Sequence, residues 1–274
     1  MPQNILDSVK QRGLIVAHRG ARSLAPENTL AAARLGLAAG ARMWDIDTRL
    51  TSDGVPVLIH DSDLLRISNA RDRFPGRSPW QVDQFSLKEL KELDFGSWFQ
   101  KSDPFGQITA GRISECQVEK YRGEPVVTLE EAIRFTVEND WLINIEIKDL
   151  ARRPADVCVV ERVVSLIRSA DAVERVLISS FNYSYLAQVR KLDRQIKTGV
   201  LTSTVHPDPV ALLSELDAFT YNPSFRAFSP IQARRLRRKG FGVLVWVINN
   251  AFVGRGCLAM GANGIFTDFP RRFS

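Results

Sequence analysis

Cysteine is scarce in this sequence, and long apolar runs are absent. The three cysteines, Cys116, Cys158 and Cys257, are far apart and form no CxxC pair, so the sequence predicts neither a disulfide framework nor a zinc site. No segment approaches the roughly 18 consecutive apolar residues of a membrane span. The N-terminal stretch MPQNILDSVKQRG has neither an apolar core nor a small-residue cleavage pattern. We therefore expect a cytoplasmic protein without a membrane span.

Acidic residues are outnumbered by basic ones. There are 37 Lys and Arg against 31 Asp and Glu, a net charge of +6, and one stretch holds much of the excess: Arg234, Arg235, Arg237, Arg238 and Lys239. Such a cluster can attract nucleic acid or anionic lipid, but it also suits the solvated face of a helix. We favour the solvated face, expect a small-molecule partner rather than nucleic acid, and leave the oligomeric state open.

Apolar segments rich in Val and Ile recur along the chain and predict nine strands. They are LIVAH (14–18), MWDID (43–47), VPVLIH (55–60), WLINIEI (141–147), VLISSF (176–181), TGVLT (198–202), AFTYN (218–222), VLVWVIN (243–249) and GIFTD (264–268). Helix-like stretches separate most of them; in NTLAAARLGLAAG, Asn28 or Thr29 can cap the helix and Gly40 can end it. This alternation, over 274 residues, predicts a (β/α)8 TIM barrel ahead of an open doubly wound sheet.

Nine strands are one too many for such a barrel. The segment TRLTSDG between MWDID and VPVLIH is too short for a crossover helix, so these two strands should form a hairpin. With the turn centred on Ser52 and Asp53, Leu50 would face Val55 and Asp45 would face His60. Eight parallel strands then remain for the barrel.

The segment from about 62 to 125 has little periodicity and an aromatic and Pro/Gly bias, as in RDRFPGRSPW and WFQKSDPFGQ. We expect a small insertion after the second histidine, placed over the barrel mouth, within a single barrel domain that spans residues 1–274.

Reactive and charged residues interrupt the predicted strand ends, where barrel enzymes carry their working side chains. They are His18 and Arg19, Asp45 and Asp47, His60, and Glu146 and Lys148. A spacing of two places each carboxylate pair or carboxylate–lysine pair on one face of its strand. Any one of them alone is as well explained by a structural role, and the third histidine, His206 in TVHPDP, reads as a loop residue.

Three of these residues are carboxylates flanked by large apolar residues. Buried charges of one sign are costly unless they are paired or bind a cation. The set Asp45, Asp47 and Glu146 offers only oxygen ligands and suits Mg²⁺ or Ca²⁺ rather than zinc. Arg19 and Lys148 add fixed positive charge, so the group points to an anionic substrate, most simply a phosphate ester, with two histidines to move protons.

Several ordered motifs make the sequence similar to the glycerophosphodiester phosphodiesterase family. The matching segments are HRGARSLAPENT (18–29), WDIDTRLTSDGVPVLIHD (44–61), NIEIK (144–148), SSF (179–181), WVIN (246–249) and GANGIFTDFP (261–270). The resemblance implies a (β/α)8 barrel that hydrolyses glycerophosphodiesters to sn-glycerol 3-phosphate and an alcohol with a divalent metal.

The same resemblance implies a role for each matching residue. His18 and His60 take the general acid and base positions, and Asp45, Asp47 and Glu146 take the metal-ligand positions. Arg19 and Lys148 would contact the phosphate, and Trp246 would line the substrate pocket. The family usually has glutamate where this chain has Asp45, so we expect weaker metal affinity or a changed metal preference. Glu27 and Asn28 fit a capping or loop-bracing role at least as well as a site role.

Two other functions remain open at this point. One is a lysophospholipase D-type phosphodiesterase acting on lysophospholipids, for which the insertion and the basic surface would meet a lipid aggregate. The other is a non-catalytic phosphate-ester binding protein, motivated by the shorter Asp45. The retained pair of histidines argues against a mere binding protein, because binding requires charge but not two proton carriers.

Overall fold

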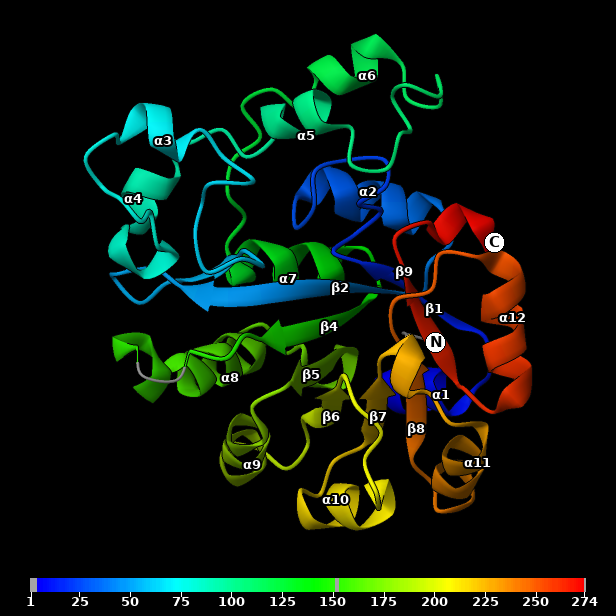
Figure 1. Ribbon diagram of the computed structural model, residues 1–274. Coiled ribbons are helices and arrows are strands. Elements are labelled where there is room, and N and C mark those ends of the chain that lie inside the picture. The colour runs from blue at the N-terminus through cyan, green and yellow to red at the C-terminus, as the bar shows by residue number, and fades with distance from the viewer. Residues whose placement is uncertain (1–3, 151–152, 274) are drawn as a thin grey trace.

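The fold is a closed barrel of parallel strands with helices around it (Figure 1). The structure, a computed structural model, describes residues 4–150 and 153–273; residues 1–3, 151–152 and 274 of the expected 1–274 domain lie outside these ranges. Nine strands hydrogen-bond in the order β1-β9-β8-β7-β6-β5-β4-β2-β3, and an additional pairing of β1 with β2 closes the barrel. Eight of them are parallel and β3 is antiparallel to β2. The predicted (β/α)8 barrel is therefore confirmed.

All nine expected strands are present, with ends shifted by up to four residues. Their bounds are β1 (Leu14–His18), β2 (Met43–Leu50), β3 (Pro56–Leu58), β4 (Leu142–Ile147), β5 (Val176–Ser180), β6 (Lys197–Thr202), β7 (Thr220–Pro223), β8 (Gly242–Val245) and β9 (Gly264–Thr267).

Seven helices cover the outside of the barrel between the described strands. They are α2 (Leu30–Ala38), α7 (Leu129–Glu138), α8 (Val159–Ser169), α9 (Tyr183–Leu192), α10 (Pro209–Glu215), α11 (Pro230–Arg238) and α12 (Ala251–Met260). Of the two candidate caps for α2, Thr29 is the one used. The sequence did not predict α12, because Gly254 and Gly256 lower its helix propensity. Packing explains the glycine at position 254, because a Cβ there would come 2.4 Å from the ring of Phe273.

The first helix, α1 (Ile5–Lys10), closes the end of the barrel opposite the site. Its Ile5 and Val9 join a buried cluster with inward-facing residues of the strands, among them Leu14, Met43 and Leu244. Gly242 makes room for this helix, since a Cβ there would lie 2.3 Å from Val9. Among the described residues, no helix is both long and apolar enough to cross a membrane.

The β2–β3 hairpin exists, but its predicted register is wrong by one residue. Leu50 pairs with Pro56 and Thr48 with Leu58, whereas the sequence suggested that Leu50 faces Val55. A three-residue turn is the reason: Thr51 and Val55 close it through a backbone hydrogen bond of 3.0 Å, and Gly54 takes a φ of +76°. Asp45 lies outside the hairpin ladder and pairs with His18 on β1 and Asn144 on β4, not with His60.

The segment between β3 and α7 contains short helices only. These are α3 (Ala70–Arg73), η1 (Val82–Gln84), α4 (Leu87–Leu90), α5 (Ser97–Ser102) and α6 (Glu115–Glu119). One part packs on Val57 and Ile59 of β3 and its flank; the other packs Phe99 and Tyr121 against Ala32 of α2. The segment thus lies beside the barrel, along β3 and α2, rather than across the mouth as expected (Figure 1). The remaining single-turn helices are η2 (Pro154–Val157), η3 (Val173–Arg175), η4 (Phe225–Ala227) and η5 (Pro270–Arg272).

Candidate active site

The alternation of side chains along the strands brings the predicted site residues together. On β1, Leu14 and Val16 belong to the buried barrel interior, and His18, two residues further, reaches the cavity at the mouth. On β2, Met43 occupies the same interior cluster and Asp45 reaches the cavity. On these two strands the inward-facing side chains are therefore apolar in the lower part of the barrel, and ionisable at the end where the cavity opens.

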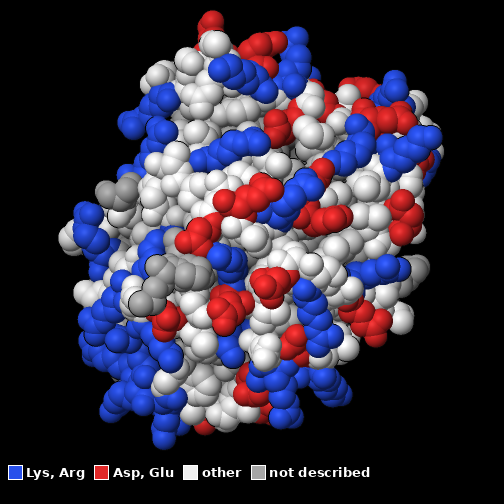
Figure 2. Space-filling view, turned by 180° about the vertical axis from the view of Figure 1, so that it is seen from behind, with Lys and Arg blue, Asp and Glu red and all other residues white. Residues whose placement is uncertain are grey.

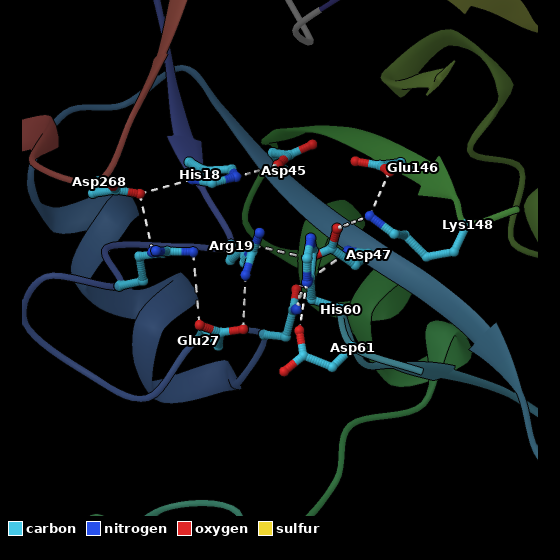
Figure 3. Close-up of polar contacts among 12 residues, drawn as sticks. His18, Arg19, Glu27, Asp45, Asp47, His60, Asp61, Glu146, Lys148 and Asp268 are labelled. Carbon is cyan, nitrogen blue, oxygen red and sulfur yellow. Dashed lines mark hydrogen bonds and ion pairs between the residues drawn. The ribbon is translucent and has the colours of Figure 1, made fainter. Parts of the chain in front are cut away.

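A cavity of about 300 Å³ opens at this end of the barrel. Its polar wall contains six of the predicted site residues, namely His18, Arg19, Asp45, His60, Glu146 and Lys148, and its apolar wall consists of Phe181, Leu201, Trp246, Val247 and Phe266. Asp47, the remaining predicted residue, is 1% exposed and lies among these side chains. Figure 3 shows how closely the charged groups approach one another.

His18 is held by a carboxylate that the sequence analysis did not single out. Its Nδ1 lies 2.7 Å from Oδ1 of Asp268, and Asp268 also contacts Arg22 at 3.0 Å and accepts a 2.7 Å hydrogen bond from Asn249. Burial alone would raise the pKa of Asp268, but His18 and Arg22 hold that pKa at about 2. An ionised Asp268 requires the proton on Nδ1 of His18, which leaves Nε2 facing the cavity. Burial lowers the pKa of His18 itself, although Asp268 acts in the opposite direction.

His60 has the same arrangement with its neighbour in sequence. Its Nδ1 lies 2.7 Å from Oδ1 of Asp61, and Arg66 donates to the other oxygen of Asp61 at 2.6 Å. Burial would raise the pKa of Asp61, but the hydrogen bonds from His60 and Arg66 bring it well below its usual value. The backbone carbonyl of His60 also accepts from both Nε and Nη2 of Arg49, at 3.1 and 2.9 Å. Both the ring and the main chain of His60 are therefore fixed.

Asp47 binds the two predicted phosphate-contacting cations. Nε of Arg19 lies 3.0 Å from its Oδ2 and Nζ of Lys148 lies 3.3 Å from its Oδ1, and Asn28 donates to Oδ2 at 2.9 Å. Burial opposes ionisation, but Arg19 and Lys148 hold the pKa of Asp47 well below its usual range. Lys148 also contacts Glu146 at 2.6 Å. Asn28 therefore braces the site and does not cap α2.

Among the described residues, Asp45 forms no ion pair with Lys or Arg, and Glu146 has only Lys148, which it shares with Asp47. Burial, followed by the negative charges of Asp47 and Glu146, raises the pKa of Asp45 well above its usual value. Burial and the charge of Asp47 also raise the pKa of Glu146, although Lys148 opposes this. Asn144 donates to Asp45 at 2.6 Å. The site thus contains more negative charge than its own cations offset.

This excess of negative charge is the observation that makes a bound metal ion plausible chemically, since a cation would offset it. Within residues 4–150 and 153–273, no group of three or more His, Cys, Asp and Glu side chains is arranged to hold an ion as it stands, because Arg19 and Lys148 occupy the carboxylate oxygens of Asp47 and Glu146. The donor chemistry nevertheless fits a hard divalent cation, since all three groups offer carboxylate oxygens and repel one another.

Glu27 has a larger role at the site than the sequence indicated. It accepts from Arg19 at 2.9 Å and from Arg66 at 2.7 Å, and lies 3.6 Å from Arg22. Burial would raise the pKa of Glu27, but these guanidinium groups lower it. Glu27 connects the carboxylate partner networks of both histidines, because Arg22 also contacts Asp268 and Arg66 also contacts Asp61.

Trp246 forms part of the apolar wall of the cavity. Its indole N–H donates to the carbonyl oxygen of Asn222 at 2.8 Å. The ring of Phe181 meets Trp246 edge to face, with centroids 5.7 Å apart. Phe181 is 44% exposed, so the apolar wall continues from the cavity to the surface.

The residues that the sequence analysis missed are partners of those it found. Asp268 directly follows β9, at the end of the segment GIFTD, and Asp61 directly follows His60, so a search for carboxylates at strand ends would have found both. Arg22 and Arg66 carry no such signal, because they reach the site from loops. The third histidine, His206, lies outside the cavity wall, as expected.

The fold and this cavity are those of a barrel enzyme with a polar, acid–base site at the carboxyl ends of its strands. Residues 18–272 match the Glycerophosphoryl diester phosphodiesterase family, and the chain belongs to that family. The predicted family and the expectation of a phosphoric diester hydrolase are thereby confirmed.

Relatives that match over nearly the full length of both chains support this assignment. The chain is 30% identical to a glycerophosphodiester phosphodiesterase of Caldanaerobacter subterraneus subsp. tengcongensis, over 94% of both chains. It is also 30% identical to a glycerophosphodiester phosphodiesterase of Bacillus altitudinis, over 94% of this chain and 95% of the relative.

Solved structures share the fold. One is a putative glycerophosphoryl diester phosphodiesterase from Silicibacter pomeroyi, with a TM-score of 0.83 at 24% identity, covering 98% of this chain and 95% of that one. Another is an Oleispira antarctica phosphodiesterase in complex with the product sn-glycerol-3-phosphate, with a TM-score of 0.77 at 27% identity and 94% of both chains covered.

Proposed function

We propose that the protein hydrolyses glycerophosphodiesters to sn-glycerol 3-phosphate and an alcohol. The family match and the full-length relatives support this reaction class, and sn-glycerol-3-phosphate is the product bound in the Oleispira structure. The single observation that supports the mechanism is the pair of histidines at one cavity. Each ring has its Nδ1 within 2.7 Å of a carboxylate and its other edge available to a substrate.

In this mechanism His18 and His60 transfer protons on opposite sides of the phosphorus. Asp268 and Asp61 fix the proton on Nδ1 of each ring, so the Nε2 atoms act on the substrate. One ring removes a proton from the nucleophile, and the other protonates the leaving oxygen. Each transfer contributes on the order of 10²–10⁴-fold to the rate. The nucleophile is a water or the glycerol 2-hydroxyl of the substrate; a cyclic phosphate detected during turnover would identify the second.

Arg19 and Lys148 provide the fixed positive charge for the phosphate. Both are largely buried beside Asp47, and Asp47 and Glu146 raise the pKa of Lys148 against the effect of burial. The two side chains therefore stay charged at neutral pH. A phosphate oxygen that enters the cavity can take hydrogen bonds from them, and these bonds strengthen as negative charge develops on the phosphoryl oxygens.

Asp45, Asp47 and Glu146 would hold a divalent cation, Mg²⁺ or Ca²⁺. Glycerophosphodiester phosphodiesterases generally depend on a divalent metal. When bound, the ion supplies positive charge that polarises the phosphate and offsets the repulsion among the three carboxylates. Burial, and then the neighbouring carboxylates, raise the pKa values of Asp45 and Glu146, which supports this assignment because a bound cation would favour the ionised form of both groups.

The test combines two variants with a matched control. His18→Ala and His60→Ala should each lower kcat for glycerophosphocholine on the order of 10²–10⁴-fold while the far-UV circular dichroism stays unchanged. His206→Ala removes the third histidine outside the cavity and should keep full activity. Near-normal release of glycerol 3-phosphate by both site variants would exclude this mechanism.

Metal dependence is tested separately. EDTA should abolish turnover, and add-back of Mg²⁺ or Ca²⁺ should restore it and identify the preferred ion. Turnover that survives complete metal removal would exclude the three-carboxylate site without affecting the roles of the histidines.

Lysophospholipids are a second substrate class, which the apolar wall favours. Trp246, Phe181 and Phe266 could contact an acyl chain, and Phe181 extends this wall to the surface. Comparing the turnover of glycerophosphocholine with that of lysophosphatidylcholine at equal metal concentration distinguishes the two substrate classes. Absence of turnover of both, with every divalent ion tried, would instead indicate a phosphate-ester binding protein.

The wider organisation remains a proposal. We propose one barrel domain over residues 1–274, with residues 62–125 as its insertion, a cytoplasmic location and a small-molecule phosphodiester as partner. Nucleic acid is not expected to be a partner, and the oligomeric state stays open.

A further inference from the structure

Positive charge is concentrated in the last part of the chain. Residues 218–274 contain nine Lys and Arg but a single acidic residue, Asp268, which is buried at the site described above. This segment therefore carries a net charge of +8, whereas the whole chain carries +6. The first 217 residues have a net charge of −2, and the excess of positive charge belongs to β7, β8, β9 and the helices between them.

These residues form one flank of the barrel. The helices α11 and α12 lie next to each other on the outside of β8 and β9 (Figure 1). In the view from behind, Lys and Arg side chains gather at the lower left, where α11 lies (Figure 2). We call the exposed sides of these two helices the α11–α12 face.

The exposed side of α11 combines an apolar residue with arginines. Ile231, Arg234, Arg235 and Arg238 follow one another at a spacing that places them on one side of the helix. Ile231 is 78% exposed, and the opposite side packs Ala233 and Leu236 into the core. The side facing solvent therefore has one aliphatic residue in the first turn and arginines in the following turns.

The exposed side of α12 repeats this pattern. Phe252, in the first turn, is 81% exposed, and Arg255 lies one turn further along and is also exposed. Neither α11 nor α12 contains an acidic residue. Among the residues that the structure describes, Asp208, 3.5 Å from Arg235, is the one carboxylate within salt-bridge distance of the arginines of this face. A large exposed aromatic and a large exposed aliphatic residue beside several arginines are unusual for a surface that contacts water alone.

A hollow of about 540 Å³ continues the face at the far end of α11, and its lining consists of Arg12, Arg234, Arg237 and Arg238. No carboxylate lines it, and none of these four arginines has a recorded ion-pair partner in residues 4–150 and 153–273. Burial, and then the charge of Arg12, lowers the pKa of Arg237. Four guanidinium groups that repel one another form a site for an anion, and phosphate is the group that guanidinium binds with two parallel hydrogen bonds.

We propose that the α11–α12 face binds the surface of a membrane that contains anionic phospholipids. The arginines contact lipid phosphates, one of which enters the hollow, and Ile231 and Phe252 insert at the level of the headgroups. Both apolar residues lie in the first turns of helices that follow barrel strands, which is the end of the barrel where the cavity opens. Because the hollow lies at the other end of α11, binding lays this flank of the barrel along the membrane, with one edge of the cavity mouth beside the headgroups.

The exposed apolar residues favour a membrane over nucleic acid as the partner of this face. Phosphate contacts alone would also suit nucleic acid, but that ligand gives Ile231 and Phe252 no apolar environment. A second copy of the chain would bring two faces of the same strong positive charge together. This proposal does not depend on the reaction assigned to the site, since membrane binding is measured without turnover.

The experiment is flotation of the full-length protein with vesicles. Binding should require phosphatidylglycerol in phosphatidylcholine vesicles and weaken as salt is added. The double variant Arg234→Gln, Arg238→Gln should lower the partition coefficient roughly 25-fold, because each cation near an anionic surface contributes about fivefold. The matched control Arg112→Gln, Lys120→Gln removes two exposed cations from another part of the surface and should lower it far less.

The apolar contribution is tested by Phe252→Ser and Ile231→Ser against Val157→Ser, a change at a residue that is 85% exposed elsewhere. The first two variants should weaken vesicle binding, and the third should not. Turnover of soluble glycerophosphocholine should be the same for all variants, which shows that each one folds. Equal binding to neutral vesicles, equal effects of the two double variants, tighter binding to duplex DNA, or a dimer disrupted by Phe252→Ser would each overturn the proposal.

Discussion

Asp268→Asn is the substitution that tests most directly how the site holds His18. It keeps the shape of the side chain and removes its charge. The pKa of Asp268 is about 2 against an ordinary value of 3.8, and a difference of this size corresponds to about 2 kcal/mol of stability at neutral pH. The side chain is 4% exposed, so solvent screens little of this interaction.

The sign of the pH dependence follows from the direction of the shift. Because the pKa is lower in the folded state, the stabilisation is present above the unfolded value, near pH 4, and is lost as the pH falls toward 2. Urea unfolding of the wild type and of Asp268→Asn should therefore differ by about 2 kcal/mol at neutral pH and converge in acid. A difference that stays constant from neutral pH to about pH 2 would refute the electrostatic explanation.

The same substitution should affect the reaction. An amide at position 268 can rotate and donate to Nδ1 of His18, which would place the ring proton on Nε2. The ring could then no longer accept a proton at the cavity, and kcat should fall on the order of 10²–10⁴-fold with little change in KM. The matched control is Asp193→Asn, whose carboxylate pairs with Arg168 at 2.8 Å on the outside of the barrel and should leave kcat unchanged. Normal turnover by Asp268→Asn would show that Asp268 does not position His18.

Further predictions concern substitutions at four single positions. Asp45→Glu supplies the longer side chain that the resemblance to the family implies for this position, and the Mg²⁺ concentration for half-maximal activity should fall roughly tenfold; an unchanged value would show that the length of this side chain does not affect metal affinity. Gly20→Ala should lower the free energy of unfolding by about 2 kcal/mol or more, since Gly20 has a φ of +78° and its Cβ would lie 2.6 Å from the backbone of Ala32. Gly106→Ala, at a φ of +63° with open space around it, should cost about 1 kcal/mol. Trp246→Ala should raise KM roughly tenfold with little change in kcat, because it removes packing that is the same in the ground and transition states.

The architecture could be predicted from the sequence because two periodicities repeat around the barrel. Every expected strand is present, and one short connection, TRLTSDG, identified the hairpin that left eight parallel strands. The register of that hairpin was beyond prediction from turn residues alone. Ser52, Asp53 and Gly54 fit a two-residue turn and a three-residue turn alike, and the hydrogen bond between Thr51 and Val55 decides between them.

The site could be predicted in part for a related reason. Residues at strand ends share the inward direction of the apolar residues two positions earlier, so His18, Asp45 and Glu146 were expected to converge, and they line one cavity. The partners of the histidines depend on contacts across the chain: Asp268 is separated from His18 by 250 positions. Residue spacing within one strand gives no information about such a contact. Arg66 lies in a loop, where no periodic pattern of the sequence predicts its contacts.

The pairing of β2 with β1 and β4 shows which side chains surround Asp45. Asp45 lies between His18 on β1 and Asn144 on β4, where Asn144 donates to one carboxylate oxygen at 2.6 Å and the other lies 3.9 Å from Nε2 of His18. An aspartate at this position keeps its oxygens beside His18 rather than further into the cavity. We therefore expect the length of the side chain at position 45 to affect the protonation of His18 as well as metal affinity. The two effects can be distinguished because metal affinity changes the response to added Mg²⁺, whereas the protonation of His18 changes the pH profile at saturating metal.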